Sequence, residues 1–405
     1  MLFSYIHYYH NNSFRSVSYI LYFDQFLENL KSINLSFSKS LKRSPDFVGV
    51  PNLEFLVLEG CTSLTEIHPS LLRHKKLALL NLKDCKRLKT LPCKIEMSSL
   101  KGLSLSGCCE FKHLPEFDES MENLSMLSIE ETAIKKLPSS LGFLVSLLSL
   151  DLENCKNLFC LPDAISELKS LLILNVSGCS KFHSFPEGLK EMKSLEELIA
   201  NDTAIEELPS SVFYLENLKV ISFAGCKGSV TKSVNTFFLP FTQLLGTPQE
   251  PNGFRLPPKL CLPSLTNLNL SYCNLSEESM PKDFSNLSSL IVLNLTGNNF
   301  VSAPSCISKL PKLEYLGLSW CEILQKLPEF PASMRVLDAS NCASFETSRF
   351  NLSRPCSLFA SQIQRHSHLP RLLKSYMEVC ILASLTFSCV FVCVCVCALV
   401  SVSLT

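Results

Sequence analysis

The chain has little glycine, one tryptophan and no excess of either charge. It contains 13 glycines among 405 residues, and its 37 basic residues balance 37 acidic ones. Few glycines argue against abundant phosphate-binding loops, and a neutral balance gives no global attraction to nucleic acid. The sequence also lacks the nucleotide-binding motif GxxxxGK[ST], the zinc-protease motif HExxH and the hydrolase motif GxSxG. We therefore expect no enzyme, with no catalytic residue, cofactor, metal site, small-molecule substrate or nucleic-acid partner.

Cysteine, in contrast, is abundant, with 20 residues. Nine of them recur at one position of a repeating pattern, namely Cys61, Cys85, Cys108, Cys155, Cys179, Cys226, Cys273, Cys321 and Cys342. There is no C-x-x-C pair and no zinc-like Cys/His spacing. The N-terminus lacks the apolar core of a secretory signal. We therefore expect a cytoplasmic protein whose thiols stay reduced.

The pattern L-x-x-L-x-L-x-x-C repeats thirteen times. Its units begin at Leu30, Leu53, Leu77, Leu100, Leu124, Leu147, Leu171, Leu195, Leu218, Leu265, Leu290, Leu313 and Met334. The steps are 21 to 25 residues, apart from one of 47. A fixed period in this range is typical of leucine-rich repeats. It predicts an α/β leucine-rich-repeat solenoid, a curved horseshoe with a parallel sheet on its concave face and a short helix or 3₁₀ segment per unit on the outside.

The pattern predicts which side chains of a unit point into the core and which point outward. Positions 1, 4 and 6 should point into the core, and positions 3, 5 and 7 outward. Position 9 follows the strand, where cysteine would act as a small buried apolar residue with a weak donor. A reactive role for Cys179 is disfavoured because its eight equivalents cannot all be active sites.

The spacing also predicts the organisation of the chain. Residues 1–29 form an N-terminal segment or cap, residues 30–345 the repeats, residues 346–378 a linker and residues 379–405 an apolar tail. The 47-residue step includes residues 227–262, which hold either a degenerate repeat or a loop; we favour a partly ordered insertion.

The tail has 27 residues and no charge. About 20 apolar residues are enough to span a bilayer, so residues 379–402 could cross a membrane as a transmembrane helix. Arg365, Arg371 and Lys374 precede the tail, which fits a tail-anchored protein with its repeats in the cytoplasm. The alternative is a low-complexity Val-Cys segment, such as read-through of a dinucleotide repeat would give, that is prone to aggregate.

Several segments resemble a known family. Residues 30–47, 50–71, 132–144, 203–228 and 275–316 are similar to the leucine-rich region of plant intracellular immune receptors, the nucleotide-binding leucine-rich-repeat proteins with an N-terminal TIR domain. The resemblance implies repeats that recognise pathogen effectors and restrain a nucleotide switch. This sequence has no nucleotide-binding motif and 29 residues before its first unit, so we expect a truncated, repeat-only relative.

The predicted function is therefore a non-enzymatic protein-binding module in plant defence and innate immunity. It would recognise an effector, or regulate an immune receptor, through the concave face. The alternative is a membrane-anchored fragment of a cell-surface leucine-rich-repeat receptor. Several N-x-[ST] triplets would suit that alternative, including those at Asn123, Asn175, Asn269 and Asn294.

Three groups of side chains are candidates for the binding surface. Position 3 is largely apolar, with Phe55, Leu79, Met126, Ile173, Val220, Val292 and Tyr315. Glu130, Glu131, Asp151 and Glu153 form an acidic group over two neighbouring units. Tyr272 and Trp320 add aromatic rings near Tyr315, with Tyr214 further away. Exposed apolar surface often marks an interaction site. Alternatively, neighbouring residues cover part of the apolar lane, and the acidic group is an ordinary solvated surface.

Overall fold

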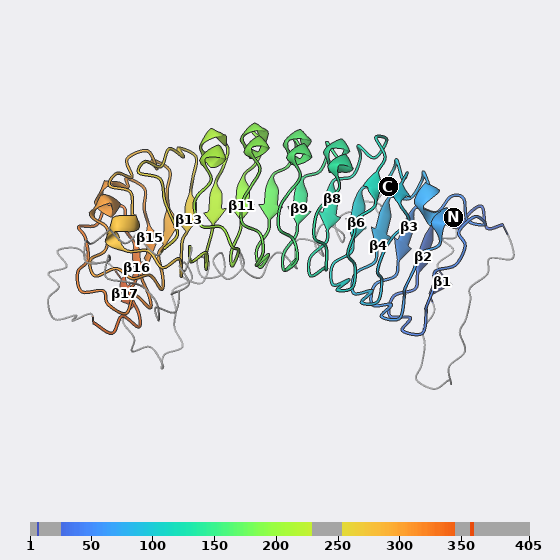
Figure 1. Cartoon of the computed structure of the whole chain (residues 1–405), viewed down its shortest axis with the longest axis horizontal. Coiled ribbons are helices and arrows are strands. Elements are labelled where there is room, and N and C mark those ends of the chain that lie inside the picture. The colour runs from blue at the N-terminus through green and yellow to red at the C-terminus, as the bar shows by residue number, and fades with distance from the viewer. Residues whose placement is uncertain (1–5, 8–25, 229–252, 345–356, 360–405) are drawn as a thin grey trace, which may run out of the picture. The chain divides into compact units, whose positions relative to one another are not determined.

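The computed structural model describes residues 6–7, 26–228, 253–344 and 357–359 (Figure 1). The chain divides into two compact units, residues 1–358 and 359–405, and the repeats lie in the first. In the described part, thirteen strands from the predicted repeats and two further strands form one continuous sheet. The predicted leucine-rich-repeat solenoid is confirmed.

The sheet contains one three-residue strand from each of the thirteen predicted units, with β1 before them and β17 after them. Its strands are β1 (Ile6–His7), β2 (Ser32–Asn34), β3 (Phe55–Val57), β4 (Leu79–Asn81), β6 (Gly102–Ser104), β8 (Met126–Ser128), β9 (Ser149–Asp151), β10 (Ile173–Asn175), β11 (Glu197–Ile199), β12 (Val220–Ser222), β13 (Asn267–Asn269), β14 (Val292–Asn294), β15 (Tyr315–Gly317), β16 (Val336–Asp338) and β17 (Ser357–Phe359). Neighbours from β1 to β16 pair in parallel. From β2 to β16, each strand occupies positions 3 to 5 of its unit, so equivalent residues of consecutive units lie side by side.

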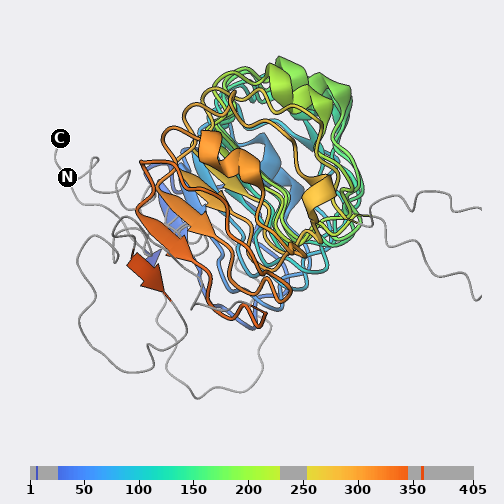
Figure 2. The ribbon, with the colours of Figure 1, turned by 90° about the vertical axis from the view of Figure 1, so that its left-hand side faces the viewer.

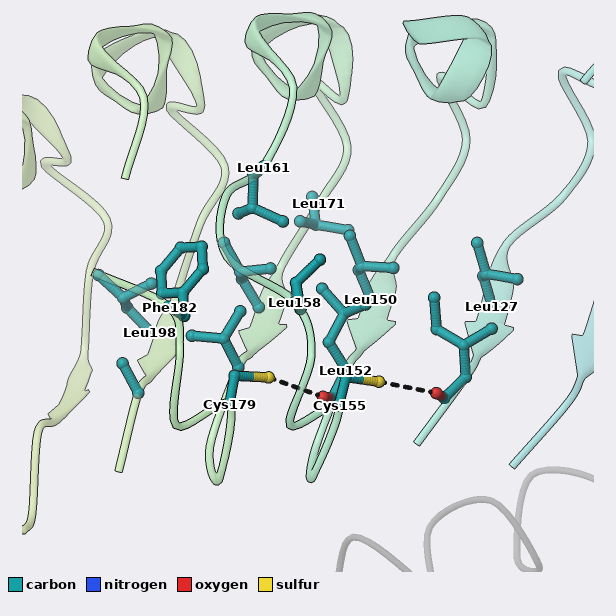
Figure 3. Close-up of a cluster of buried hydrophobic side chains, with 14 of the residues drawn as sticks. Leu127, Leu150, Leu152, Cys155, Leu158, Leu161, Leu171, Cys179, Phe182 and Leu198 are labelled. Atoms are coloured by element: carbon teal, nitrogen blue, oxygen red, sulfur yellow. Dashed lines mark hydrogen bonds between the residues drawn. The ribbon is translucent and has the colours of Figure 1, made fainter. Parts of the chain in front are cut away.

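Leucines at positions 1, 4 and 6 make the core because strand alternation and the following turn direct them inward. Leu150, Leu152 and Leu171 are completely buried in the middle of the array (Figure 3). The buried side chains form one cluster that runs from Leu30 to Leu337. Each unit therefore covers the apolar side of its neighbours, as expected for stacked repeats.

The sheet covers one side of the solenoid, and the second half of each unit lies on a different side (Figure 2). Its helical elements within the described residues are the 3₁₀ turns η1 (Pro69–Arg73), η2 (Ser139–Phe143), η3 (Asp163–Glu167), η4 (Glu187–Glu191), η5 (Ser210–Tyr214), η6 (Glu277–Ser279) and η7 (Ser305–Lys309). A proline directly precedes η2 to η5 and η7, where its fixed φ and missing N–H suit the start of a turn. In two units, the short strands β5 (Lys94–Ile95) and β7 (Glu116–Phe117) pair with each other instead.

The 47-residue step leaves the sheet uninterrupted, because β12 pairs directly with β13. Residues 229–252 lie outside the described part of the chain. The two residues that flank them, Gly228 and Gly253, lie against each other. Phe254 then packs on Phe223 of the same unit, with 5.4 Å between ring centroids. Without residues 229–252, this unit would have the ordinary length of 23 residues.

The predicted apolar tail, residues 379–405, and all of the predicted linker 346–378 except residues 357–359 also lie outside the described residues. Within the described ranges, no helix has the length and apolar character needed to cross a bilayer.

Candidate protein-interaction surface

The cysteines at position 9 are structural groups. Cys179 Sγ donates a hydrogen bond to the carbonyl oxygen of Leu152 at 3.2 Å, and Cys155 Sγ donates to that of Ile129 at 3.1 Å (Figure 3). The other seven thiols donate to the equivalent position-6 carbonyl of the preceding unit. Burial raises the pKa of Cys155 to about 11 and holds the pKa of Cys179 above its usual range. Burial and the shared hydrogen bond therefore favour a structural role for these thiols over a reactive one.

The apolar lane of position 3 lies on the open side of the sheet, at the first residue of each strand. All seven predicted members, Phe55, Leu79, Met126, Ile173, Val220, Val292 and Tyr315, are half-buried. The strand register places Phe55 beside Leu79 and Val292 beside Tyr315. In the central units, polar residues such as Ser149 separate the apolar members. The lane therefore has apolar pairs near both ends, and Val336, which the sequence analysis missed, extends the second pair.

The polar side chains at position 5 hold the backbone. Asn175 Oδ1 accepts the backbone N–H of Ser177 at 3.0 Å, two residues further on. The same bond recurs at Asn34, Asn81, Asp151, Asn269, Asn294 and Asp338. Such Asx turns satisfy an N–H where the strand ends. The polar side chains at position 5 therefore stabilise the turns after the strands, although they also lie on the open side of the sheet.

The predicted acidic residues come together in space. Asn175 Nδ2 donates to Asp151 Oδ1 at 3.1 Å and to Glu153 Oε2 at 3.3 Å, and Ser128 Oγ donates to Glu130 Oε1 at 3.0 Å. Burial, followed by the nearby charge of Glu130, holds the pKa of Asp151 well above its ordinary value. Burial is also the main cause of the raised pKa of Glu153.

This arrangement differs from the simple solvated surface considered above, because Asp151 is buried and Glu131 alone of the four is exposed. Among the described residues, no group of His, Cys, Asp and Glu is arranged to hold a metal ion.

The predicted aromatic residues occupy three different places. Tyr315 belongs to β15 in the apolar lane, whereas Tyr214 lies in η5, where Lys193 Nζ is 5.8 Å from its ring centroid. Tyr272 and Trp320 both occupy position 8, in the turn after a strand, and are 48% and 53% exposed. They line a hollow of about 460 Å³.

Position 8 is a feature that the sequence analysis missed. Its residue has a positive φ in all thirteen units, which are represented by Phe37, Gly60, Asp84, Gly107, Glu131, Asn154, Gly178, Asp202, Gly225, Tyr272, Gly297, Trp320 and Asn341. The frequent Gly, Asn and Asp at this spacing were the available signal, because these residues tolerate the left-handed region best. The large side chains at Phe37, Tyr272 and Trp320 are therefore displayed from a turn, three residues beyond the end of the strand.

Comparisons with known proteins agree with this architecture. A family model described as the leucine-rich repeats of RPS4B-like disease resistance proteins matches residues 96–183 and 167–354. TMV resistance protein N of Nicotiana glutinosa is 39% identical over 313 residues, which are 77% of this chain and 25% of that protein. Disease resistance protein RPP2B of Arabidopsis thaliana is 37% identical over 331 residues, which are 82% of this chain and 25% of that protein.

The chain thus spans about a quarter of the length of these curated relatives. Among solved structures, a leucine-rich-repeat protein of Leptospira interrogans is 21% identical and has a TM-score of 0.48, over 80% of this chain and 86% of that one. The family match covers more than half of the residues and confirms the resemblance inferred from the repeats. The chain belongs to the leucine-rich-repeat family of plant disease resistance proteins.

Proposed function

We propose that this chain is a protein-binding module of plant defence that recognises a pathogen effector, or regulates an immune receptor, through the open side of its sheet. The observation that carries the proposal is the set of half-buried apolar side chains at position 3, which lie side by side in the strand pairs β3–β4 and β14–β15. Apolar surface that neighbouring residues cover only in part is available to a protein partner. Leucine-rich repeats are generally interaction modules without catalytic activity, which is consistent with the proposal.

The names of the relatives support the same function, because they describe disease resistance and, for one of them, resistance to TMV. The matched residues make up about a quarter of these relatives, and we propose that they supply the recognition step. We further propose that this chain acts in the cytoplasm, as those receptors are expected to do.

One of the N-x-[ST] triplets is closed to glycosylation in the folded chain, which favours the cytoplasmic proposal over a cell-surface receptor fragment. Asn175, in one of the N-x-[ST] triplets, is 2% exposed, and its Nδ2 donates to Asp151 and Glu153. A glycan on that nitrogen would have to leave the folded repeat and would break both bonds. We expect glycosidase treatment of the protein from plant cells to leave its electrophoretic mobility unchanged. A mobility shift would favour the cell-surface alternative.

Proximity labelling in leaf cells tests the binding surface. The full chain, fused to a biotin ligase, is compared with a Val292→Asp/Tyr315→Ala variant, which disrupts the apolar pair in neighbouring strands β14 and β15. Tyr214→Ala is the matched control, because it removes an exposed aromatic ring that lies in η5 rather than on the sheet. We expect the labelled proteins to lose specific members in the double variant and to keep them in the control. Equal labelling by all three proteins, each with an unchanged melting temperature, would refute the proposal.

A further inference from the structure

The hollow beside Trp320 lies at the turns that follow the strands, outside the position-3 lane. Its lining consists of Tyr272, Gly297, Asn299, Trp320, Glu322 and Ile323, which come from three consecutive units. Two large exposed aromatic side chains and one carboxylate thus border a single space. No basic residue is among these six.

The turn geometry explains why the space is open. At position 8, a side chain leans toward the next unit: the Tyr272 ring lies so close to Gly297 that a Cβ atom there would overlap it. Phe37 lies on Gly60 in the same way. Tyr272 and Trp320 are two units apart, so their backbones are separated by roughly 10 Å, twice the usual spacing of paired strands. Because Gly297 has no side chain, the Tyr272 ring can lie against its backbone, and the hollow extends from that ring to Trp320.

The chemistry of the lining favours a cation. Aromatic faces attract cations within about 6 Å of the ring, and arginine does this most often because its planar group also stacks on rings. Glu322 is exposed and borders the same hollow, so its carboxylate can pair with a guanidinium group. The Asn299 side chain donates a hydrogen bond from its Nδ2 to Asn274 Oδ1. It adds a further polar group to the lining of the hollow.

We propose that this hollow is a binding site for an arginine side chain of a protein partner, which is held between Tyr272 and Trp320 and paired with Glu322. The guanidinium group lies in the interval between the two rings, where it forms a charge-assisted hydrogen bond with the Glu322 carboxylate. That the arginine belongs to a protein partner rests on the function proposed above. The affinity of the hollow for guanidinium does not, and it is tested separately.

The chain contains one tryptophan, so the intrinsic fluorescence of Trp320 reports on the site directly. The full chain is titrated with N-acetyl-arginine amide, and separately with N-acetyl-citrulline amide, which has nearly the same shape but no charge. We expect a saturable change in Trp320 emission with the arginine probe and roughly 2- to 5-fold weaker binding of the citrulline probe, the scale of one exposed cation–π contact or ion pair.

Two variants and one control locate the effect. Glu322→Gln should weaken the arginine probe roughly 2- to 5-fold and should reduce the difference in affinity between the two probes. Tyr272→Leu should weaken both probes. Phe37→Leu, the matched control at position 8 in a distant unit, should leave both titrations unchanged. Melting curves followed by circular dichroism verify that each variant is folded.

An absent or non-saturable response to the arginine probe, or equal affinity for both probes, would overturn the proposal. So would an unchanged affinity in folded Glu322→Gln. A negative titration would not contradict the role proposed for the position-3 lane, because the labelling experiment uses other residues. Conversely, a loss of labelling without probe binding would place recognition on the sheet alone.

Discussion

At the scale of single residues, position 9 shows how one small side chain can join neighbouring units. The thiols reach the position-6 carbonyl of the preceding unit, as Cys179 reaches Leu152. Thr132 is shorter, and its Oγ1 donates to Ile129 of its own unit. Asn298 does both, because its Nδ2 donates to Leu270 of the preceding unit and to Leu295 of its own. Cysteine is therefore used here as a donor between units, with its apolar bulk in the core.

Alkylation with iodoacetamide should separate the two kinds of cysteine. Cys93, Cys109 and Cys261 are exposed and should react in the native protein, whereas Cys155 and Cys179 should react only after unfolding. The reason is burial, which blocks access and raises the pKa of Cys155 to about 11. Mass spectrometry of labelled peptides gives the order of reaction. Early labelling of Cys179 in folded protein would contradict the structural role.

The raised pKa values of the buried thiols also predict how the stability of the fold changes at alkaline pH. A thiol whose pKa is higher in the folded than in the unfolded chain favours folding while it is protonated, so its contribution is complete below the unfolded value near 9. It is lost as the pH rises from there toward the folded value, about 11 for Cys61 and Cys155. We therefore expect the stability of the repeats to fall steadily above pH 9.

Asp151 offers a second prediction at this scale. Its folded pKa is raised by burial and by Glu130, so the folded state prefers the protonated form, and stability falls as the pH rises above the ordinary value of 3.8. Asp151→Asn should keep the bond to the Glu153 N–H, as the asparagines of other units do, and donate to Glu130. We expect about 1 kcal/mol of added stability at pH 7, the scale of one buried hydrogen bond.

Chemical denaturation at pH 7 and pH 4 measures this effect. The advantage of the asparagine variant should shrink at pH 4, where Asp151 of the natural chain is largely protonated. Asp338→Asn is the control, because its residue makes the same Asx turn in a half-buried site. If both variants changed stability equally at both pH values, the charge of Asp151 would not be the cause.

At the scale of the repeat element, the turn at position 8 fixes where side chains are displayed. Gly178 has φ +69°, and a Cβ atom there would overlap the Asn154 side chain. Gly178→Ala should therefore cost about 1–2 kcal/mol for the left-handed backbone alone, and more for the contact with Asn154. Thermal unfolding measures the loss. Gly102→Ala is the control, because Gly102 lies in β6 without a positive φ and its Cβ would meet only the flexible end of Leu79, at 3.0 Å.

The sequence period predicted the elements well because strand position and core direction depend on residues within one unit. Leu150 and its equivalents show this, since their spacing alone assigned them to the core. The second halves could not be predicted as well: whether a unit forms a turn such as η3 or a pair such as β5 with β7 depends on the neighbouring unit.

The surface shows the same division between local and neighbouring effects. The sequence assigned Asp151 to an outward position, but in the structure its side chain is buried and interacts with Glu130 and Asn175 of the adjoining units. The hollow that Tyr272 and Trp320 line likewise involves three units. It depends on Gly297, a glycine at position 8, as well as on the two aromatic residues.

At the scale of the whole repeat array, stability is carried by contacts between neighbouring units, so an interruption matters only where it separates two of them. The step between β12 and β13 is informative, because the two strands pair directly. Arg255 N donates to Glu206 O at 2.8 Å, and the carbonyl of Arg255 accepts from Leu208 N at 3.0 Å. The segment that follows the long step therefore completes its unit against the preceding one.

A deletion of residues 229–252 tests whether they are an insertion within one unit. We expect the shortened chain, with Gly228 joined to Gly253 through two glycines, to keep its circular dichroism spectrum and to unfold at nearly the same temperature, because the two ends already lie together. A shorter loop loses less entropy on closure, which should add up to about 1 kcal/mol. Phe254→Ala is the contrasting variant: its buried ring packs on Phe223, so it should cost about 3–5 kcal/mol. If the deletion instead removed cooperative unfolding, residues 229–252 would have to supply part of the core, and the 47-residue step would hold two repeats rather than one.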